Sequence, residues 1–185
     1  MYSKQTILTE EEIIKGCSKN DPKCQKMLFD RYSGKMFAVC IRYTASMEDA
    51  EDVLQEGFVR VFNYIQTYKN AGSLEGWIRR VIINVAIRHY QKTKTHHEMM
   101  QHNNNAELTT MPEVISQLSE QDLLAIINQL PEGYKIVFNL YAIEGYSHLE
   151  IGEMLGIQES TSRSQLTKAR KILNEKIRKI YKIAI

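Results

Sequence analysis

The chain has 185 residues and a formal net charge of only +2, so its total charge does not by itself indicate a nucleic-acid partner. Its length suits one domain or two small ones, and a hydrophobic fraction of 43% is that of a globular protein with a buried core. With three prolines, nine glycines and no long alternation of apolar and polar residues, the sequence predicts an all-α fold.

The cysteines and the N-terminal residues indicate the compartment. Cys17, Cys24 and Cys40 form no C-x-x-C pair, and their odd number argues against a disulfide framework, so we expect buried, reduced thiols. The first residues lack the apolar core of a signal peptide, and no stretch is long and apolar enough to cross a bilayer. The sequence therefore predicts a cytoplasmic protein.

Four helices are expected before residue 95, each opened by a side chain that can accept from the first backbone N–H groups. Thr9 and Glu12 form a T-x-x-E capping box, and Asp21 precedes a proline at the first helical position. Ser46 and Ser73 mark the starts of the third and fourth helices.

The third predicted helix carries a row of carboxylates. At about 100° per residue, Asp49, Asp52 and Glu56 fall within about 60° of one another, and the apolar residues fall on a different face. Such a row is typical of a docking surface for a basic partner helix, or of a metal or acid–base site. The second kind of site usually includes a histidine at a fixed offset, which this segment lacks. Docking is the preferred interpretation, with merely solvated charges as the alternative.

The fourth predicted helix has a polar, basic face opposite an apolar one. Arginines on such a face neutralise phosphates, and an asparagine can read a base edge. In the preceding loop, Tyr64 and Tyr68 are candidates to stack on an unpaired base, although packing and capping explain them equally well. Trp77 is assigned to the core. The polar face consists of Arg80, Asn84, Arg88 and Gln91.

A polar segment without apolar periodicity follows at 94–110. This composition predicts a flexible linker between two small helical domains. We divide the chain into a first domain at 1–95, a linker at 96–117 and a second domain at 118–185. No cysteine at ligand spacing accompanies the histidines of this segment, so we expect neither a metal nor a cofactor. These histidines are His96, His97 and His102.

Helical spacing resumes after the linker. Apolar residues recur from Leu118 to Leu130, and Pro131 opens another helix that we expect to end at Gly145 as its C′ glycine.

The segment after Gly145 predicts a helix-turn-helix. Ser147 and Glu150 form a second capping box, and Gly156 stands where the chain must turn in a left-handed conformation, with Ile157 tucked inward after it. A second helix is expected to begin within residues 158–160. Its inner stripe is expected to be Leu166, Ala169 and Leu173.

The outer side of that second helix has the composition of a DNA-recognition surface. Arginine and lysine supply contacts to phosphates and guanine edges, and small hydroxyl side chains permit close approach to the groove. An ordinary αα-hairpin with a basic solvent face is the alternative, but cap, turn, stripe and basic face agree in one register. Ser162 does not fit this pattern, because it falls on the inner stripe where an aliphatic residue is expected. The candidate contact residues are Ser160, Thr161, Arg163, Ser164, Thr167 and Lys168.

Two sets of residues resemble the extracytoplasmic-function (group four) sigma factors of bacterial RNA polymerase. Residues 49–58, DAEDVLQEGF, are similar to the D-A-E-D-x-x-Q-E-x-F segment of region two. Leu130-Pro131, Gly145-Tyr146-Ser147 and Leu155-Gly156-Ile157 are similar to region four, which in that family binds the upstream (minus-thirty-five) promoter element. The resemblance spans about 10–94 and 118–178, and Ser162 and Gln165 depart from the family's pattern.

This resemblance implies a DNA-binding transcription initiation factor rather than an enzyme. Its partners are then core RNA polymerase, promoter DNA and an anti-sigma factor. The residues that then dock onto the polymerase's large catalytic subunit are Asp49, Asp52, Gln55 and Glu56. The residues implied at the downstream (minus-ten) element are Tyr68, Arg80, Asn84, Arg88 and Gln91.

Two other functions remain open from the residues alone. A conventional helix-turn-helix repressor or activator explains residues 118–185 but leaves the acidic helix unused. An anti-sigma-like adaptor protein uses the acidic helix but leaves the recognition helix unused.

Overall fold

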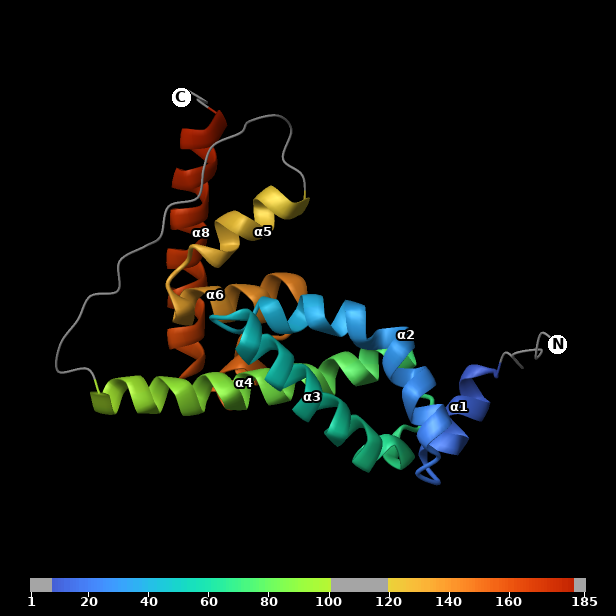
Figure 1. Cartoon of the computed structure of the whole chain (residues 1–185). Helices are drawn as coiled ribbons and strands as arrows, with labels where there is room; N and C mark the ends of the chain where they lie inside the picture. Colours follow the sequence, from blue (N-terminus) through green and yellow to red (C-terminus); the bar gives the residue numbers. More distant parts are fainter. Residues whose placement is uncertain (1–7, 101–119, 182–185) are drawn as a thin grey trace. The chain divides into compact units, whose positions relative to one another are not determined.

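The computed structural model describes residues 8–100 and 120–181. Every element of secondary structure assigned in these two ranges is a helix or a helical turn (Figure 1). The predicted all-α class is therefore confirmed for the described part of the chain. The contacts divide the chain into two compact units, Met1–Tyr90 and Gln91–Ile185, each of which is described by itself below.

The first unit begins with the helices that the sequence predicted. The capping box of Thr9 and Glu12 is present, Asp21 caps the second helix ahead of Pro22, and the Ser46 side chain accepts from the N–H of Asp49. Ser73 likewise accepts from the N–H of Gly76 at the start of the fourth helix. The elements are α1 (Glu10–Cys17), α2 (Pro22–Ile41), α3 (Met47–Tyr64), the short 3₁₀ turn η1 (Ile65–Thr67) and α4 (Leu74–Met100), of which the part as far as Tyr90 belongs to this unit.

The core of the first unit forms where α2, α3 and α4 present their apolar faces. Phe58 is 2% exposed and meets Phe29 edge-to-face at 4.8 Å between ring centroids. Gly57 allows α3 to approach α4 closely, because a Cβ there would lie 2.2 Å from Cδ1 of Ile82. A buried Tyr32 donates its hydroxyl to Glu10 at 2.7 Å and so ties α2 to α1.

The fourth helix extends further than the sequence predicted. The segment expected to be linker from residue 94 is helical as far as Met100. Residues 91–100 contain neither proline nor glycine, and a helix that is already nucleated propagates until a breaker or a cap ends it. Polar composition by itself was therefore a poor signal for the end of this helix. The remainder of the predicted linker, as far as residue 117, and His102 within it lie outside the described residues.

All three cysteines are buried, free thiols in the first unit, as predicted. Burial raises the pKa of the Cys17 thiol to about 11. Burial also raises the pKa of the Cys40 thiol to about 12. Because the thiolate is the reactive form, these groups are unreactive while the unit stays folded.

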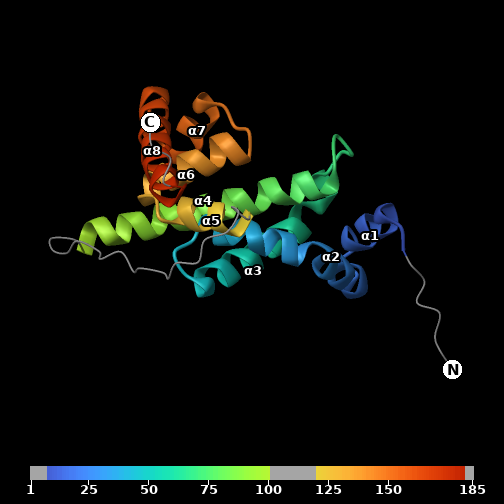
Figure 2. The same ribbon diagram turned by 90° about the horizontal axis from the view of Figure 1, so that it is seen from above.

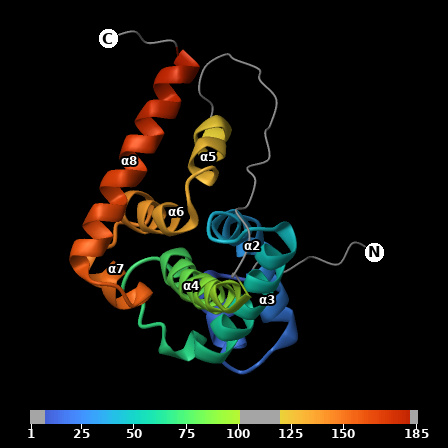
Figure 3. The ribbon, with the colours of Figure 1, turned by 90° about the vertical axis from the view of Figure 1, so that its left-hand side faces the viewer.

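The second unit contains α5 (Glu120–Asn128), α6 (Glu132–Phe138), the π-helical turn η2 (Asn139–Ile143), α7 (His148–Leu155) and α8 (Glu159–Tyr181). The helices α5, α6 and α7 all lie on one side of α8, and α7 lies beside its N-terminal end (Figures 2 and 3). The helix opened by Pro131 leads through η2 to Gly145, which has the predicted left-handed backbone with φ of 79°. The sequence did not predict the widened turn within it.

The core of the second unit lies between α5 and α8. It contains Ile126, Ile127 and Leu130 on one side and Ala169 and Leu173 on the other. Tyr134 and Phe138 of α6 pack against this cluster. In neither unit does a described helix combine the length and the apolar character that crossing a membrane requires.

Candidate nucleic-acid and protein interfaces

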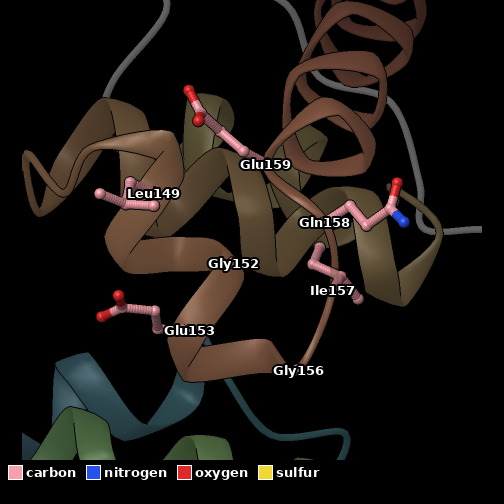
Figure 4. Close-up of a pocket in the computed structure, with 7 residues that line it drawn as sticks. All are labelled: Leu149, Gly152, Glu153, Gly156, Ile157, Gln158 and Glu159. Atoms are coloured by element: carbon pink, nitrogen blue, oxygen red, sulfur yellow. The ribbon is translucent and has the colours of Figure 1, made fainter.

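The helix-turn-helix is built on a very close turn between α7 and α8. Ser147 and Glu150 form the predicted capping box, and Gly156 has φ of 66°. The N–H of Ile157 donates to the carbonyl of Gly152 at 3.0 Å, and a Cβ on Gly152 would lie 2.8 Å from the carbonyl oxygen of Ile157. The turn therefore requires a glycine at position 152. Figure 4 shows α7 passing through this turn into α8 around a shallow pocket lined in part by Leu149 and Glu153.

The second helix of the motif starts within the predicted range and turns the predicted stripe inward. Leu166, Ala169 and Leu173 are buried, which confirms the inner stripe, whereas Ile157 in the turn is only half-buried. Of the candidate contact residues, Thr161 is half-buried, and the others are exposed. Those exposed residues are Ser160, Arg163, Ser164, Thr167 and Lys168.

Intramolecular contacts hold several of these exposed side chains in place. The guanidinium of Arg163 pairs with the carboxylate of Glu159 one turn earlier. The ammonium of Lys168 lies 5.9 Å from the ring centroid of Tyr134. The hydroxyl of Thr167 donates to the backbone carbonyl of Arg163 at 3.0 Å. The side chains of Arg163 and Lys168 thus lie on the solvent side of α8, and each also has a contact within the protein.

Ser162, which did not fit the aliphatic stripe, has a hydrogen-bond partner that the sequence did not reveal. Ser162 is fully buried, and its Oγ lies 2.9 Å from Nδ1 of His148, which is 8% exposed. The imidazole also stacks on Tyr141 at 4.4 Å between centroids, and the guanidinium of Arg170 lies 5.7 Å from the centre of that ring. A polar residue at an aliphatic position was the available signal, but its partner lies 14 residues upstream and no local rule connects the two.

The acidic row on α3 is present, but its members differ in their surroundings. Asp49 is half-buried, because Oδ1 lies 3.2 Å from Nε2 of His89 and Oδ2 accepts from the Ser46 hydroxyl at 2.7 Å. Asp52 and Gln55 are exposed, and Glu56 is exposed but paired with Arg60 at 2.7 Å. The apolar face is the core, as predicted, since Val53, Leu54, Phe58, Val61 and Ile65 are all buried.

His89 also bears on the metal interpretation of that row. The sequence argument found no histidine within the helix, yet the fold brings one from α4 against Asp49. Across the described residues no group of three or more histidine, cysteine or carboxylate side chains lies close enough to hold a metal ion. The side chains of His96 and His97 are outside that description.

On α4 the predicted polar face is open to solvent. Arg80, Asn84 and Arg88 are exposed, and Gln91 is half-buried. The opposite side is deeply buried, with Ile78, Ile82 and Val85 at 1% exposure or less.

The two tyrosines expected in the loop before α4 differ in their placement and in how accessible their rings are: Tyr68 lies in that loop, whereas Tyr64 is the last residue of α3. Tyr68 donates its hydroxyl to the carbonyl of Gly72 at 2.7 Å, and its ring lies 5.8 Å from that of Trp77. Tyr64 is 55% exposed. The ring of Tyr68 is thus engaged by the loop and by Trp77, and that of Tyr64 is the more accessible stacking group.

The two ranges of the chain that carry these candidate surfaces match two known protein regions. The family model described as sigma-70 region 2 matches residues 28–95, and the model described as sigma-70, region 4 matches residues 120–173. The chain is 25% identical to the ECF RNA polymerase sigma-E factor of Haemophilus influenzae, over 92% of this chain and 96% of that one. It is 27% identical to the ECF RNA polymerase sigma factor SigW of Bacillus subtilis, over 89% of this chain and 95% of that one. The chain is an extracytoplasmic-function sigma factor.

A solved structure has the same fold. The sigma factor RpoE of Bartonella quintana, crystallised with the anti-sigma factor NepR, superposes with a TM-score of 0.53 at 17% identity, over 86% of this chain and 98% of that one. By the two family matches and its curated relatives, the sigma factor described here belongs to a stress-responsive family of non-catalytic initiation factors, which bind core RNA polymerase and promoter DNA. Its function is to direct RNA polymerase to promoters and so to start transcription.

Proposed function

We propose that this sigma factor holds a promoter at two places and the polymerase at a third. The acidic residues of α3, with Gln55 among them, dock on core RNA polymerase. The outer side of α4 and the loop before it capture the separated downstream strand, and the outer side of α8 binds the upstream duplex. The observation that carries this proposal is that the polar face of each helix is largely solvent-exposed while the opposite face forms the core.

At the downstream element, exposed cations and an exposed ring supply the contacts that a single strand requires. Arg80 and Arg88 neutralise phosphates, and Asn84 between them is free to reach a base edge. Because the Tyr68 ring packs on Trp77, we assign stacking on an unpaired base to Tyr64 first and to Tyr68 second. Gln91 ends this surface.

At the upstream element, Arg163 and Lys168 carry the contacts to guanine edges or phosphates, and the small side chains Ser160, Ser164 and Thr167 permit close approach. Thr161 stands at the edge of this surface. In this proposal the first domain (1–95) and the second (118–185) act through the linker at 96–117. The protein works in the cytoplasm, where RNA polymerase acts, and an anti-sigma factor holds it inactive until a signal arrives.

Reconstitution with core RNA polymerase tests the proposal. The full chain and core enzyme select bound duplexes from a randomised double-stranded library, and the selected duplex then serves as template for transcription. We expect two short sequence elements to be enriched and a transcript to depend on both. Tight, specific binding of duplex by the protein without polymerase, and no transcript with it, would indicate a repressor instead.

Replacing Arg163 by alanine should weaken binding of the selected duplex by about 1–2 kcal/mol and relax the base preference at one upstream position. The same substitution at Lys168 should weaken binding similarly for every sequence and reduce its salt dependence, because a lysine–phosphate contact carries no sequence information. Titrating labelled duplex with holoenzyme at several salt concentrations measures both effects. Unchanged affinity in both variants would contradict the assignment of α8.

A further inference from the structure

The helix-turn-helix contains a directional polar contact between its two helices. His148 is the first residue of α7, and Ser162 lies in the first turn of α8. Their side chains meet at 2.9 Å, with His148 8% exposed and Ser162 fully buried. Apolar packing tolerates small rotations of one helix against another, whereas a hydrogen bond fixes donor and acceptor to within a few tenths of an ångström.

A second contact anchors α8 further along its length. The ring of Tyr141 stacks on the imidazole with an interplanar angle of 19°, and Arg170 of α8 lies over the same tyrosine ring. Ser162 and Arg170 are eight residues apart, which is about 12 Å along a helix. Contacts at two positions that far apart restrain both the rotation of α8 about its axis and its tilt.

The residues that face DNA follow directly on the first anchor. Arg163 and Ser164 are the next two residues after Ser162, and both are exposed. A rotation of α8 by about 20° at a helix radius of several ångströms displaces a long side chain by about 2 Å or more, which is enough to lose a hydrogen bond to a base edge.

We propose that the His148–Ser162 hydrogen bond is a positioning device that sets the rotation of α8, and with it the sequence discrimination of the upstream DNA contact. This inference rests on the proposed role of α8 in binding upstream DNA. His148 and Ser162 are positioning residues: they act through Arg163 and Ser164 and do not touch DNA themselves.

The Ser162 hydroxyl can donate to an unprotonated Nδ1 of His148 or accept from a protonated one, and the site disfavours the charged imidazole. Burial and the neighbouring Arg163 lower the pKa of His148, with Arg170 acting in the same direction and Glu159 against it. Tyr141 supplies the stacked ring from η2. In the unfolded chain the imidazole has a pKa of about 6.5. The contribution of the neutral His148 imidazole to the free energy of unfolding is therefore complete above that pH. This contribution is lost as the pH falls towards and through the lower pKa of the folded state.

The test separates discrimination from stability. The measured quantity is the ratio of holoenzyme affinities for the selected promoter duplex and for the same duplex with its upstream element scrambled. Unfolding of the second unit lowers the amount of active protein equally for both duplexes and leaves the ratio unchanged. Ser162→Ala should lower the ratio about fivefold at pH 7.5, the loss that one buried hydrogen bond corresponds to.

A double variant keeps the proposal testable if Ser162→Ala melts too easily. His148→Phe with Ser162→Val replaces the polar pair by an apolar one and retains a ring against Tyr141. We expect its melting temperature to recover towards that of the natural protein, while the ratio stays low. Full recovery of the ratio in this variant would overturn the proposal.

Arg163→Ala distinguishes the failure of this inference from that of the proposed function. A lower ratio in Arg163→Ala with an unchanged ratio in Ser162→Ala would retain upstream DNA binding by α8 and reject the positioning role. An unchanged ratio in both variants would reject the upstream contact itself, and the positioning proposal with it.

Discussion

Replacing Gly152 by valine is expected to destabilise the second unit by about 3 kcal/mol and to remove upstream DNA binding. The Cβ of any residue at position 152 would lie 2.8 Å from the carbonyl oxygen of Ile157, which belongs to the backbone and has no rotamer to change. Relief therefore requires α7 and α8 to separate, and this breaks the 3.0 Å hydrogen bond from Ile157 to Gly152 and exposes Ile151 and Leu166.

Calorimetric melting of the full chain measures this effect, because a domain of this size shifts by about 4–8 °C for each kcal/mol. Gly34→Val is the matched control. Gly34 is exposed in α2, and its added Cβ would meet nothing within 4 Å, so the change in free energy of unfolding should stay within about 0.5 kcal/mol. Equal melting of the two variants would show that the turn between α7 and α8 tolerates a side chain.

Reversing two charges on the acidic row should weaken binding to core RNA polymerase about a hundredfold. Asp52→Lys with Glu56→Lys places two ammonium groups where the proposed docking site presents carboxylates to a basic partner surface, and like charges brought together at an interface cost several kcal/mol. Asp52 is exposed, and Glu56 gives up only a surface pair with Arg60, so the helix itself should remain intact. Asp49 is less suitable, because it also contacts Ser46 and His89.

Fluorescence titration of labelled sigma factor with core enzyme measures the affinity, and circular dichroism checks the helix. Glu11→Lys with Asp30→Lys is the control: it changes the net charge equally on exposed positions of α1 and α2. Natural affinity in the Asp52 and Glu56 variant, or an equal loss in the control variant, would reject docking through this face.

The local features of this fold were predictable, because each is encoded within a few residues. The capping residues Thr9, Asp21, Ser46 and Ser147 each act on amides two or three positions away, so a short pattern is enough to identify them. The left-handed backbone of Gly156 was likewise predictable, since the last turn of a helix and its C′ residue are neighbours in sequence.

The features that escaped prediction depend on residues distant in sequence or on a balance between similar energies. His89 reaches Asp49 across 40 residues, and His148 reaches Ser162 across 14. The π-helical turn at Asn139–Ile143 differs from a regular helix by a small change in hydrogen bonding that no residue pattern specifies. The identity of the exposed faces could be predicted, but which of their side chains are already engaged within the protein could not.

The positions of the cysteine thiols and of the tryptophan indole make this sigma factor convenient to follow in solution. Its three cysteines and its single tryptophan, Trp77, all lie in the first unit, so the second unit has none of these reporters. A maleimide or iodoacetamide reagent can label Cys17 or Cys40 only in molecules whose first unit has opened, because those thiols are buried. The labelling rate of Cys17 and Cys40 in the free and the polymerase-bound protein therefore records how often the first unit opens, without any engineered probe and without a signal from the second unit.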